Sequence, residues 1–479
     1  MERIALVDDL FLWLEARQQP LHVAGLQIFS LPPDAPANYI QQTAEFMRES
    51  AQPLPPFDQH IVERRFGSYW GRDTAFDINH HFRHVALPKP GGVKELLTFV
   101  SCEHSNLLDR SRPLWEVHLI EAVHGRHFAL YTKIHHALMD GVSAMYLSMR
   151  CLSPDPNQRD MPPMWQTQLP VNHSQPISQS LLGSLKSRAS KMGGQLGAQL
   201  GTLRPVISLL YKTYKEAQEN PELANAFKAP PSRLNQPITG SRRFAAESYG
   251  RARLKELAVR TNSTCNDIIL AMCGTALRNY LRSIDSLPEQ SLISMVPVSL
   301  RKEDSFGGNQ VAMILANLAT HKENPLERLA ITKQSMEEAK ETFQGMTKEQ
   351  ATNYTAALLA PSFIPLLTGF LPKWLAFNVV ISNVPGSKQT LYWNGAKQER
   401  HYPVSAIANH MALNITIISY EDRYEFGLVG CRRTLPSMQR LLQYLEDALL
   451  ELEQLLGVSS PSPKNKRRVK SKPLTGKVI

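Results

Sequence analysis

The stretch from Phe128 to Gly141 constrains the fold of this chain more than any other part of its sequence. It reads Phe-Ala-Leu-Tyr-Thr-Lys-Ile-His-His-Ala-Leu-Met-Asp-Gly. Its first residues are β-formers and aromatics, which predict a strand of about seven residues. Gly141 permits a turn, and the residues after it place apolar side chains at helical spacing through Arg150. Two adjacent histidines, His135 and His136, are therefore predicted where a strand ends and a helix begins.

These two histidines suggest general-base chemistry. A neutral imidazole has an ordinary pKa of about 6.5, so it can take a proton from a hydroxyl or a thiol at neutral pH. Successive side chains of a strand point to opposite faces, so one of His135 and His136 should face a cleft while the other packs inward. Asp140 is close enough to shape the turn, cap the helix or bind an arginine, and we interpret it as scaffold rather than as an acid.

Two other interpretations fit the same residue types. The two histidines could be a buried, hydrogen-bonded pair beside a helix cap, with a purely structural role. A metal site would need further ligands, but adjacent histidines diverge on a strand and no other cluster has the spacing of metal ligands. We therefore expect no metal.

The complete string His-His-x-x-x-Asp-Gly resembles the active-site signature of acyl-CoA-dependent acyltransferases related to chloramphenicol acetyltransferase. Within that superfamily it is most similar to the bacterial wax ester synthase/acyl-CoA:diacylglycerol acyltransferase family. Further family blocks occur in the right order between residues 8 and 430. They are Asp8–Glu15, Pro113–Glu116, Asn266-Asp267, Pro297–Arg301, Gly308-Asn309 and Ser382–Gly386.

The resemblance implies an α/β fold with two chloramphenicol-acetyltransferase-like domains. Each would be a mixed sheet flanked by helices, with a long crossover connection and a channel between the domains. A length of 479 residues also favours two domains. We expect a first half over residues 1–150 with the histidine motif, a helical and irregular connection over 151–240, a second half over 241–457, and a disordered basic tail over 458–479.

The resemblance also implies a reaction. The family moves a long-chain acyl group from acyl-CoA to a long-chain fatty alcohol, which makes a wax ester, and less efficiently to diacylglycerol, which makes triacylglycerol. Acyl-CoA is then a substrate, and no cofactor is expected. His136 would be the general base and His135 auxiliary. Asn266 would steady the oxyanion or orient the base, although a role as a helix-cap residue is equally open.

Other residues are assigned to support or binding. Arg301 is the candidate partner of Asp140, Asp267 is the expected N-cap of a helix over residues 267–281, and Trp115 supports the site. The substrate-binding candidates are Ser382, Asn383, Ala360 and Gly369. The last two lie in a stretch, residues 350–372, that carries no charge but is interrupted by prolines, so we do not expect it to span a membrane. In the family this region is associated with acyl-chain and alcohol selection.

Several enzyme classes lack their usual marks here. The chain has no Gly-x-Ser-x-Gly elbow, no P-loop and no Gly-x-Gly-x-x-Gly turn, which argues against lipase-like, ATP-driven and dinucleotide-dependent reactions. A reaction that needs only a base and a preactivated donor remains, and a thioester is such a donor.

Charge and cysteine content limit which partners and which cellular compartment we expect. The net charge is +10, but the last 22 residues hold seven of the 53 Lys and Arg residues and none of the 43 acids. The rest of the chain is nearly neutral, so we expect no nucleic-acid partner. Five scattered cysteines and an acidic N-terminus favour a reducing cytoplasm over export.

Contact with lipid is predicted from three segments: a basic amphipathic pattern within residues 181–215, the uncharged stretch 350–372, and the basic tail. We expect peripheral association with the inner membrane face or with lipid inclusions. The sequence carries no signal for a particular oligomeric state.

Two alternative functions remain. The chain could be a catalytically inactive homologue that coats lipid droplets or membranes, although the intact His136, Asp140 and Gly141 speak against it. It could also acylate another hydroxyl or an amine, as related condensation domains do, although no carrier-domain serine motif is present.

Overall fold

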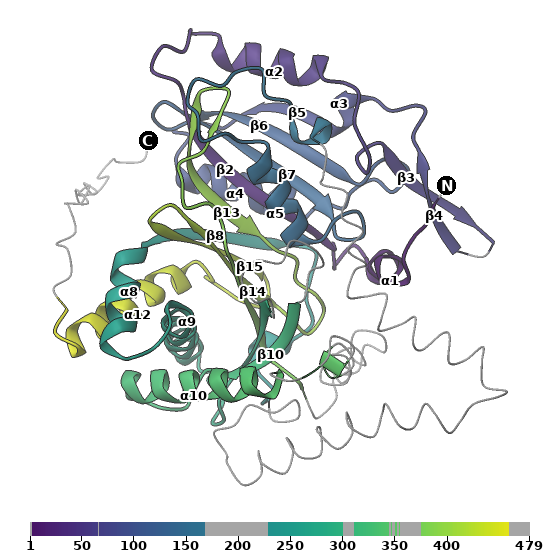
Figure 1. The fold of residues 1–479 in the computed structure, drawn as a ribbon. Helices are drawn as coiled ribbons and strands as arrows, with labels where there is room; N and C mark the ends of the chain where they lie inside the picture. Colours follow the sequence, from purple (N-terminus) through teal and green to yellow (C-terminus); the bar gives the residue numbers. More distant parts are fainter. Residues whose placement is uncertain are drawn as a thin grey trace, which may run out of the picture.

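Two mixed six-stranded sheets form the frame of the molecule (Figure 1). The computed structural model describes residues 2–65, 67–167, 229–299, 311–343 and 375–458, together with Met346, Gln350, Ala351 and Tyr354. In spatial order, the N-terminal sheet contains β12 (Tyr392–Trp393), β13 (Ala396–Val404), β2 (His22–Ser30), β7 (His127–His135), β6 (Trp115–Val123) and β5 (Phe82–Ala86). The C-terminal sheet contains β10 (Val311–Asn317), β9 (Ile293–Ser299), β11 (Val379–Val384), β14 (Leu413–Tyr420), β15 (Arg423–Cys431) and β8 (Arg242–Gly250). A small sheet near the N-terminus contains β1 (Glu2–Arg3), β4 (Gly67–Arg72) and β3 (Gln59–Arg64).

Helices flank both large sheets, as expected for an α/β fold. The described helices of the first half are α1 (Leu6–Leu14), α2 (Tyr39–Glu49), α3 (Ile78–His81), α4 (Val93–Glu103) and α5 (Gly141–Arg150). Those of the second half are α8 (Arg251–Arg260), α9 (Cys265–Arg282), α10 (Pro325–Phe343) and α12 (Arg440–Leu455), which gather on one side of the C-terminal sheet (Figure 1). The strand and the helix predicted around the two histidines are β7 and α5.

The N-cap of α9 differs from the prediction. Asp267 is not the cap; the cap is Thr264, whose hydroxyl accepts a hydrogen bond from the Asp267 backbone N–H at 3.2 Å. The Asp267 carboxylate in turn accepts from the Thr264 backbone N–H at 2.8 Å. Such a capping box satisfies donors at both positions, so Asp267 still stabilises the helix start, but from its third residue.

The predicted boundary between the halves does not hold for the strands. Residues 241–457 were expected to form the second half, but β12 and β13 leave it and complete the N-terminal sheet, where β13 pairs antiparallel with β2. Sequence patterns cannot reveal this crossing because a strand has the same alternation of side chains whichever sheet it joins.

The predicted boundary at residue 150 is also too early. Met161, Met164 and Trp165 are buried in the core of the first half, although they were expected in the connection. Trp165 stacks on Trp115 with ring centroids 5.2 Å apart, and its indole N–H donates to the Ser50 carbonyl oxygen at 2.7 Å. The prolines around these residues removed the helical or strand periodicity, so the sequence analysis did not recognise them as core.

The two halves meet along β13, β15 and the end of α4. His104, just after α4, hydrogen-bonds the Ser405 carbonyl oxygen at 3.0 Å, and the Tyr420 hydroxyl donates to the Gln398 carbonyl oxygen at 3.0 Å. A side chain at Gly427 in β15 would place its Cβ 1.8 Å from the Pro403 carbonyl oxygen of β13. The interface therefore depends on close backbone approach.

Three predicted lipid-contact segments lie outside the described residues: the basic pattern within 181–215, almost all of 350–372, and the tail beyond Val458. Among the helices that the structure describes, none combines the length and the apolar character that a membrane span requires.

Replacing Gly427 by alanine tests the interface. The added Cβ would overlap the Pro403 carbonyl, so we expect the Gly427→Ala variant to lose about 3 kcal/mol of unfolding free energy. Gly250→Ala is the matched control, because a Cβ there meets nothing within 4 Å. Urea unfolding of both variants measures the difference, and equal stability would contradict the close approach of β13 and β15.

Candidate active site

The histidine turn, residues 135–141, joins the end of β7 to the start of α5. Backbone hydrogen bonds hold it on both sides. The His135 N–H donates to the Leu114 carbonyl oxygen at 3.0 Å, and the His136 N–H donates to the Leu21 carbonyl oxygen at 3.0 Å. The turn therefore sits between the segments that precede β6 and β2, and its position is set by the sheet.

His135 is fully buried and faces Glu15. Its Nδ1 accepts a hydrogen bond from the Ala137 backbone N–H at 3.0 Å, so its proton is on Nε2, which lies 3.3 Å from Glu15 Oε1. The Glu15 carboxylate also accepts from the Leu21 backbone N–H at 3.1 Å and from the Arg110 guanidinium at 3.1 Å. Burial alone would raise the pKa of Glu15, but these donors outweigh it and hold that pKa below 4.5. Both ring nitrogens of His135 thus face groups of the scaffold.

His136 is only partly buried, and its ring is held in one orientation. Phe11 stacks on it with centroids 4.2 Å apart and an interplanar angle of 20°. The ring also hydrogen-bonds the backbone of His136 itself. Nδ1 is the ring nitrogen within reach of that carbonyl, so Nε2 keeps the lone pair. Burial lowers the pKa of His136 below 6.5, while Asp140 opposes the shift and His135 adds to it. The imidazole is therefore neutral at pH 7.

Asp140 is the N-cap of α5. Its Oδ1 accepts from the backbone N–H groups of Val142 and Ser143 at 3.0 and 2.9 Å, and its Oδ2 accepts from the Ser143 hydroxyl at 2.8 Å. The interpretation of Asp140 as scaffold agrees with this geometry. Its proposed partner Arg301 lies outside the described residues.

Gly141 differs from the expectation. It is the first residue of α5, its backbone is not left-handed, and a Cβ there would meet only Val23 at an ordinary 3.7 Å. The turn therefore does not require the conformational freedom of glycine at this position.

One face of α1 covers the histidine turn, and the sequence analysis missed it. Phe11 contacts His136, Glu15 contacts His135, and Leu12 packs in the same small core cluster as Ala137. Burial, together with the nearby Asp140, raises the pKa of Asp8 to about 6. Residues 8, 11, 12 and 15 share one face of a helix. This helical spacing could have predicted that α1 has one buried face, although it does not indicate which surface that face covers.

Two of the family blocks in the second half meet each other. Asn266, in the first turn of α9, accepts a hydrogen bond at its Oδ1 from the Asn383 amide of β11 at 3.3 Å. This contact leaves the Asn266 amide N–H₂ as a donor. Ser382 is the neighbour of Asn383 on β11 and pairs in register with Thr416 of β14. Ala360 and Gly369 lie outside the described residues.

Trp115 is buried at the start of β6, and it pairs with Ile134, the residue before His135. Its indole N–H donates to the Phe57 carbonyl oxygen at 2.9 Å, and its ring stacks on His81 at 4.6 Å between centroids. Trp115 thus anchors the strand beside the histidine turn and does not itself face it.

A cluster with metal-like geometry occurs under α4. Ligand atoms of Glu103, Glu116 and His118 lie within 4.8 Å of one another. However, the Lys133 ammonium lies 3.0 Å from Glu116 and also donates to the Glu103 carbonyl oxygen. Although burial opposes it, contact with His118, Lys133 and Arg83 lowers the pKa of Glu116 to about 2. Lys133 already supplies the positive charge here, and a divalent cation would be repelled by it.

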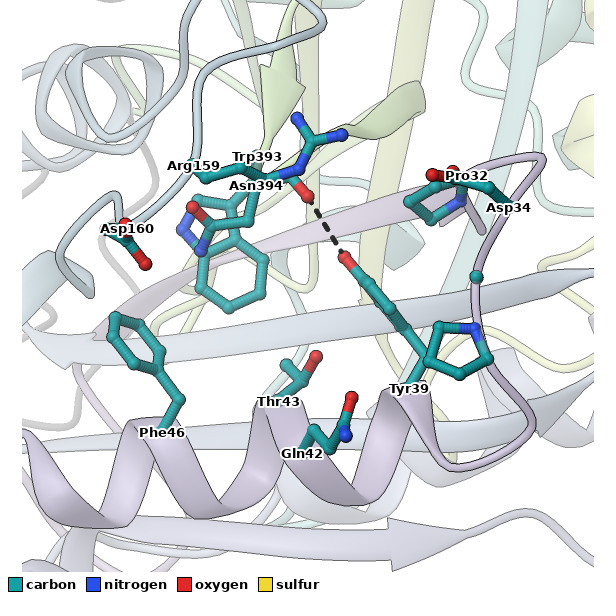
Figure 2. A pocket seen from close by; sticks show the side chains of 12 residues that line it. Pro32, Asp34, Tyr39, Gln42, Thr43, Phe46, Arg159, Asp160, Trp393 and Asn394 are labelled. Carbon is teal, nitrogen blue, oxygen red and sulfur yellow. Dashed lines mark hydrogen bonds between the residues drawn. The ribbon is translucent and has the colours of Figure 1, made fainter.

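A cavity of about 310 Å³ opens between α2 and the tip of the β12–β13 hairpin (Figure 2). Tyr39, Phe46 and Trp393 form its aromatic walls, and the Tyr39 hydroxyl donates to the Asn394 carbonyl oxygen. The cavity adjoins the Ser30 end of β2, whereas the histidine turn lies at the His22 end, roughly 26 Å away along the strand. It is therefore separate from the histidine site.

Comparisons with known proteins agree on one family. The wax ester synthase/diacylglycerol acyltransferase catalytic domain matches residues 4–269, and the C-terminal domain of the same family matches residues 307–453. The O-acyltransferase WSD of Acinetobacter baylyi is 44% identical over 94% of this chain and 96% of its own length. A Mycobacterium tuberculosis protein that is named as a putative diacylglycerol O-acyltransferase is 39% identical over 94% of this chain and 99% of its own length.

Solved structures support the same assignment. The wax ester synthase/diacylglycerol acyltransferase from Marinobacter aquaeolei is 47% identical, with a TM-score of 0.78 over 95% of this chain and all of that one. The first condensation domain of the calcium-dependent antibiotic synthetase covers 95% of this chain and 96% of its own, with a TM-score of 0.57 at 12% identity. The latter likeness concerns the fold alone, and it agrees with the predicted two-domain α/β architecture.

The buried Glu15 carboxylate offers a test of the site's construction. We expect Glu15→Gln to lower the unfolding free energy by about 3 kcal/mol, because Arg110 and His135 lose a buried charged partner. Glu49→Gln, at the exposed end of α2, is the control. Urea unfolding compares the two, and a Glu15→Gln protein as stable as the control would show that this carboxylate does not hold the turn.

Proposed function

The chain belongs to the wax ester synthase/diacylglycerol acyltransferase family and is an acyl-CoA-dependent O-acyltransferase, and from this premise we propose that His136 is its general base. One observation carries the proposal. His136 is a neutral, partly exposed imidazole whose orientation is set by Phe11 and by its own backbone, with Nε2 left to accept a proton. His135 has no nitrogen to spare, because Glu15 and the Ala137 N–H engage both.

The proposed reaction proceeds in one ternary complex. His136 Nε2 takes the hydroxyl proton of the acceptor, and the acceptor oxygen attacks the thioester carbonyl carbon of acyl-CoA. The tetrahedral intermediate collapses as its carbon–sulfur bond breaks, and the imidazolium returns the proton to the departing thiolate. The products are an oxoester and free CoA, and no acyl-enzyme forms.

Asn266 is the proposed donor to the oxyanion. Its Oδ1 is engaged by Asn383, which orients its amide N–H₂ as a donor from the start of α9. The positive end of the α9 dipole adds to the stabilisation of negative charge near this residue. Asp140 and Glu15 contribute to the proposed reaction by holding the histidine turn in position.

The acceptors are a long-chain fatty alcohol, which yields a wax ester, and diacylglycerol, which yields triacylglycerol. We propose that the alcohol is the better of the two and that acyl-CoA and acceptor enter a channel between the halves from opposite ends. Both acceptors partition from water into lipid, so the enzyme should meet them at a lipid surface. We therefore propose that the protein is cytoplasmic and associates with the inner membrane face or with lipid inclusions. No cofactor is needed, because the thioester is already activated.

Removal of the base is the direct test. We expect His136→Ala to release CoA from palmitoyl-CoA about a thousandfold more slowly than the wild type in the presence of hexadecanol. His124→Ala, an exposed histidine in the β6–β7 turn, is the control and should retain full activity. Thiol release is measured with and without the alcohol. A fully active His136→Ala protein would show that another group is the base, and a wild type inactive with both acceptors would reject the assigned reaction.

The pH dependence tests the ionisation of the base. Because the neutral imidazole is the active form and burial lowers its pKa, kcat/KM should fall only as the pH drops below 6.5. Asp140→Asn retains a cap oxygen but removes the opposing charge, so the acid limb should move to still lower pH. The Asp8→Asn variant removes the carboxyl group of Asp8, whose pKa of about 6 lies in the same range. Any acid limb that remains in this variant then belongs to His136 and not to Asp8. An acid limb above pH 6.5 in the wild type would contradict the burial effect.

A further inference from the structure

The loop between α1 and β2 holds one side of the histidine turn. Its Leu21 carbonyl oxygen accepts the His136 backbone N–H at 3.0 Å. Further back, the loop is closed by two backbone hydrogen bonds between Ala16 and Gln19, at 3.3 and 2.7 Å. Only the buried Pro20 separates Gln19 from Leu21, and its ring fixes one backbone dihedral. The position of Gln19 therefore determines the position of the carbonyl group that holds His136.

The Gln19 side chain joins this loop to the second half of the molecule. It is only 5% exposed. Its amide N–H₂ donates to the Leu14 carbonyl oxygen at 3.0 Å, and its Oε1 accepts the Asn409 backbone N–H at 2.6 Å. Leu14 ends α1, whereas Asn409 lies shortly before β14 of the C-terminal sheet. One buried amide thus bonds both halves at once, and its loss would leave a donor and an acceptor without partners.

A second contact from the same half holds the loop beside Gln19. The guanidinium of Arg242 is buried at the start of β8, and it donates to the Gln18 carbonyl oxygen at 2.9 Å. A Cβ at Gly240 would lie 2.9 Å from the Arg17 carbonyl oxygen, so the two backbones are close there. The segment from Arg17 to Gln19 is therefore enclosed by the second half.

The same part of the second half leads to the proposed oxyanion donor. Asn409 precedes β14, which pairs in parallel with β11. On β11, the Asn383 amide donates to Asn266 Oδ1 at 3.3 Å. Because the hydrogen bonds of a sheet fix the register of its strands, Asn266 and Asn409 belong to one rigid unit. Gln19 connects that unit to the loop that holds His136.

We propose that Gln19 is a positioning residue of the reaction, which sets the base His136 against the oxyanion donor Asn266. The inference rests on the proposed function, in which the two groups act on one intermediate from different halves. A misplacement of about 1 Å can lower a rate a hundredfold, so such a pair needs a direct mechanical link. Arg242 supports the link through the neighbouring carbonyl, while Gln19 makes it with its own side chain.

Hydrogen exchange tests this link without any turnover. Gln19→Met keeps a side chain of similar length but removes both hydrogen-bonding groups. We expect the peptide of residues 128–141 to exchange about tenfold faster in this variant, because the Leu21 carbonyl is held less firmly. Gln18→Met is the matched control, since the Gln18 side chain is exposed and only its backbone carbonyl meets Arg242. Equal exchange of this peptide in the two variants would overturn the proposal.

Kinetics separates positioning from a loss of stability. With palmitoyl-CoA and hexadecanol, folded Gln19→Met should show a kcat about tenfold below the wild type and a KM for palmitoyl-CoA within about twofold. Gln18→Met should match the wild type. Gln19→Asn keeps an amide at the buried position but is one methylene too short to reach both partners. It should change exchange and kcat in the same direction, so it serves as the test should Gln19→Met not fold. An unchanged kcat would contradict positioning.

A double-mutant cycle tests the connection to Asn266. If Gln19 acts by placing the base against this donor, the loss of kcat from Gln19→Met should shrink to less than about threefold in an Asn266→Ala background. Equal losses in both backgrounds would overturn the connection. A wild type that releases no thiol with either acceptor would reject the proposed function instead, while the exchange result stands apart from it.

Discussion

The buried carboxylate of Glu15 connects three segments whose relative positions determine the geometry of the site. It binds the Leu21 N–H just before β2, the imidazole of His135 at the end of β7, and Arg110 from the loop after α4. A carboxylate in this position is stable only while all of these donors surround it, because an isolated buried charge is strongly disfavoured. The arrangement of α1 over the histidine turn follows from this requirement.

The contacts around Glu15 also give the two histidines different roles. The Leu21 segment, held by Glu15, also receives the His136 N–H at its carbonyl oxygen. His135 is thereby committed to the scaffold, while His136 remains under Phe11 with a free nitrogen. A proton acceptor of fixed orientation requires such support, because a base that rotates spends little time in a reactive geometry.

The crossing of β12 and β13 to the other sheet makes the first half depend on the second. The N-terminal sheet is completed by strands that follow β11 in the chain, so the first half cannot complete its sheet alone, whereas the C-terminal sheet consists only of strands from the second half. Backbone approach at Gly427 and the hydrogen bond from His104 to the Ser405 carbonyl oxygen then fix how the halves meet. The second half supplies Asn266 and Asn383 to the proposed reaction, so its placement relative to the first half matters for the chemistry.

The sequence by itself determined the strand-turn-helix around His135 and His136, because this depends on local periodicity. The resemblance of its short motifs to a known family implied the two-domain α/β fold and the reaction. The sequence also predicted a structural role for Asp140, which is the N-cap of α5. Only the tertiary structure decided that α1 covers the turn, that Thr264 rather than Asp267 caps α9, that Met161, Met164 and Trp165 belong to the core of the first half and that two strands join the other sheet. These features arise from contacts between residues far apart in the chain, and local pattern carries no information about which surfaces will meet.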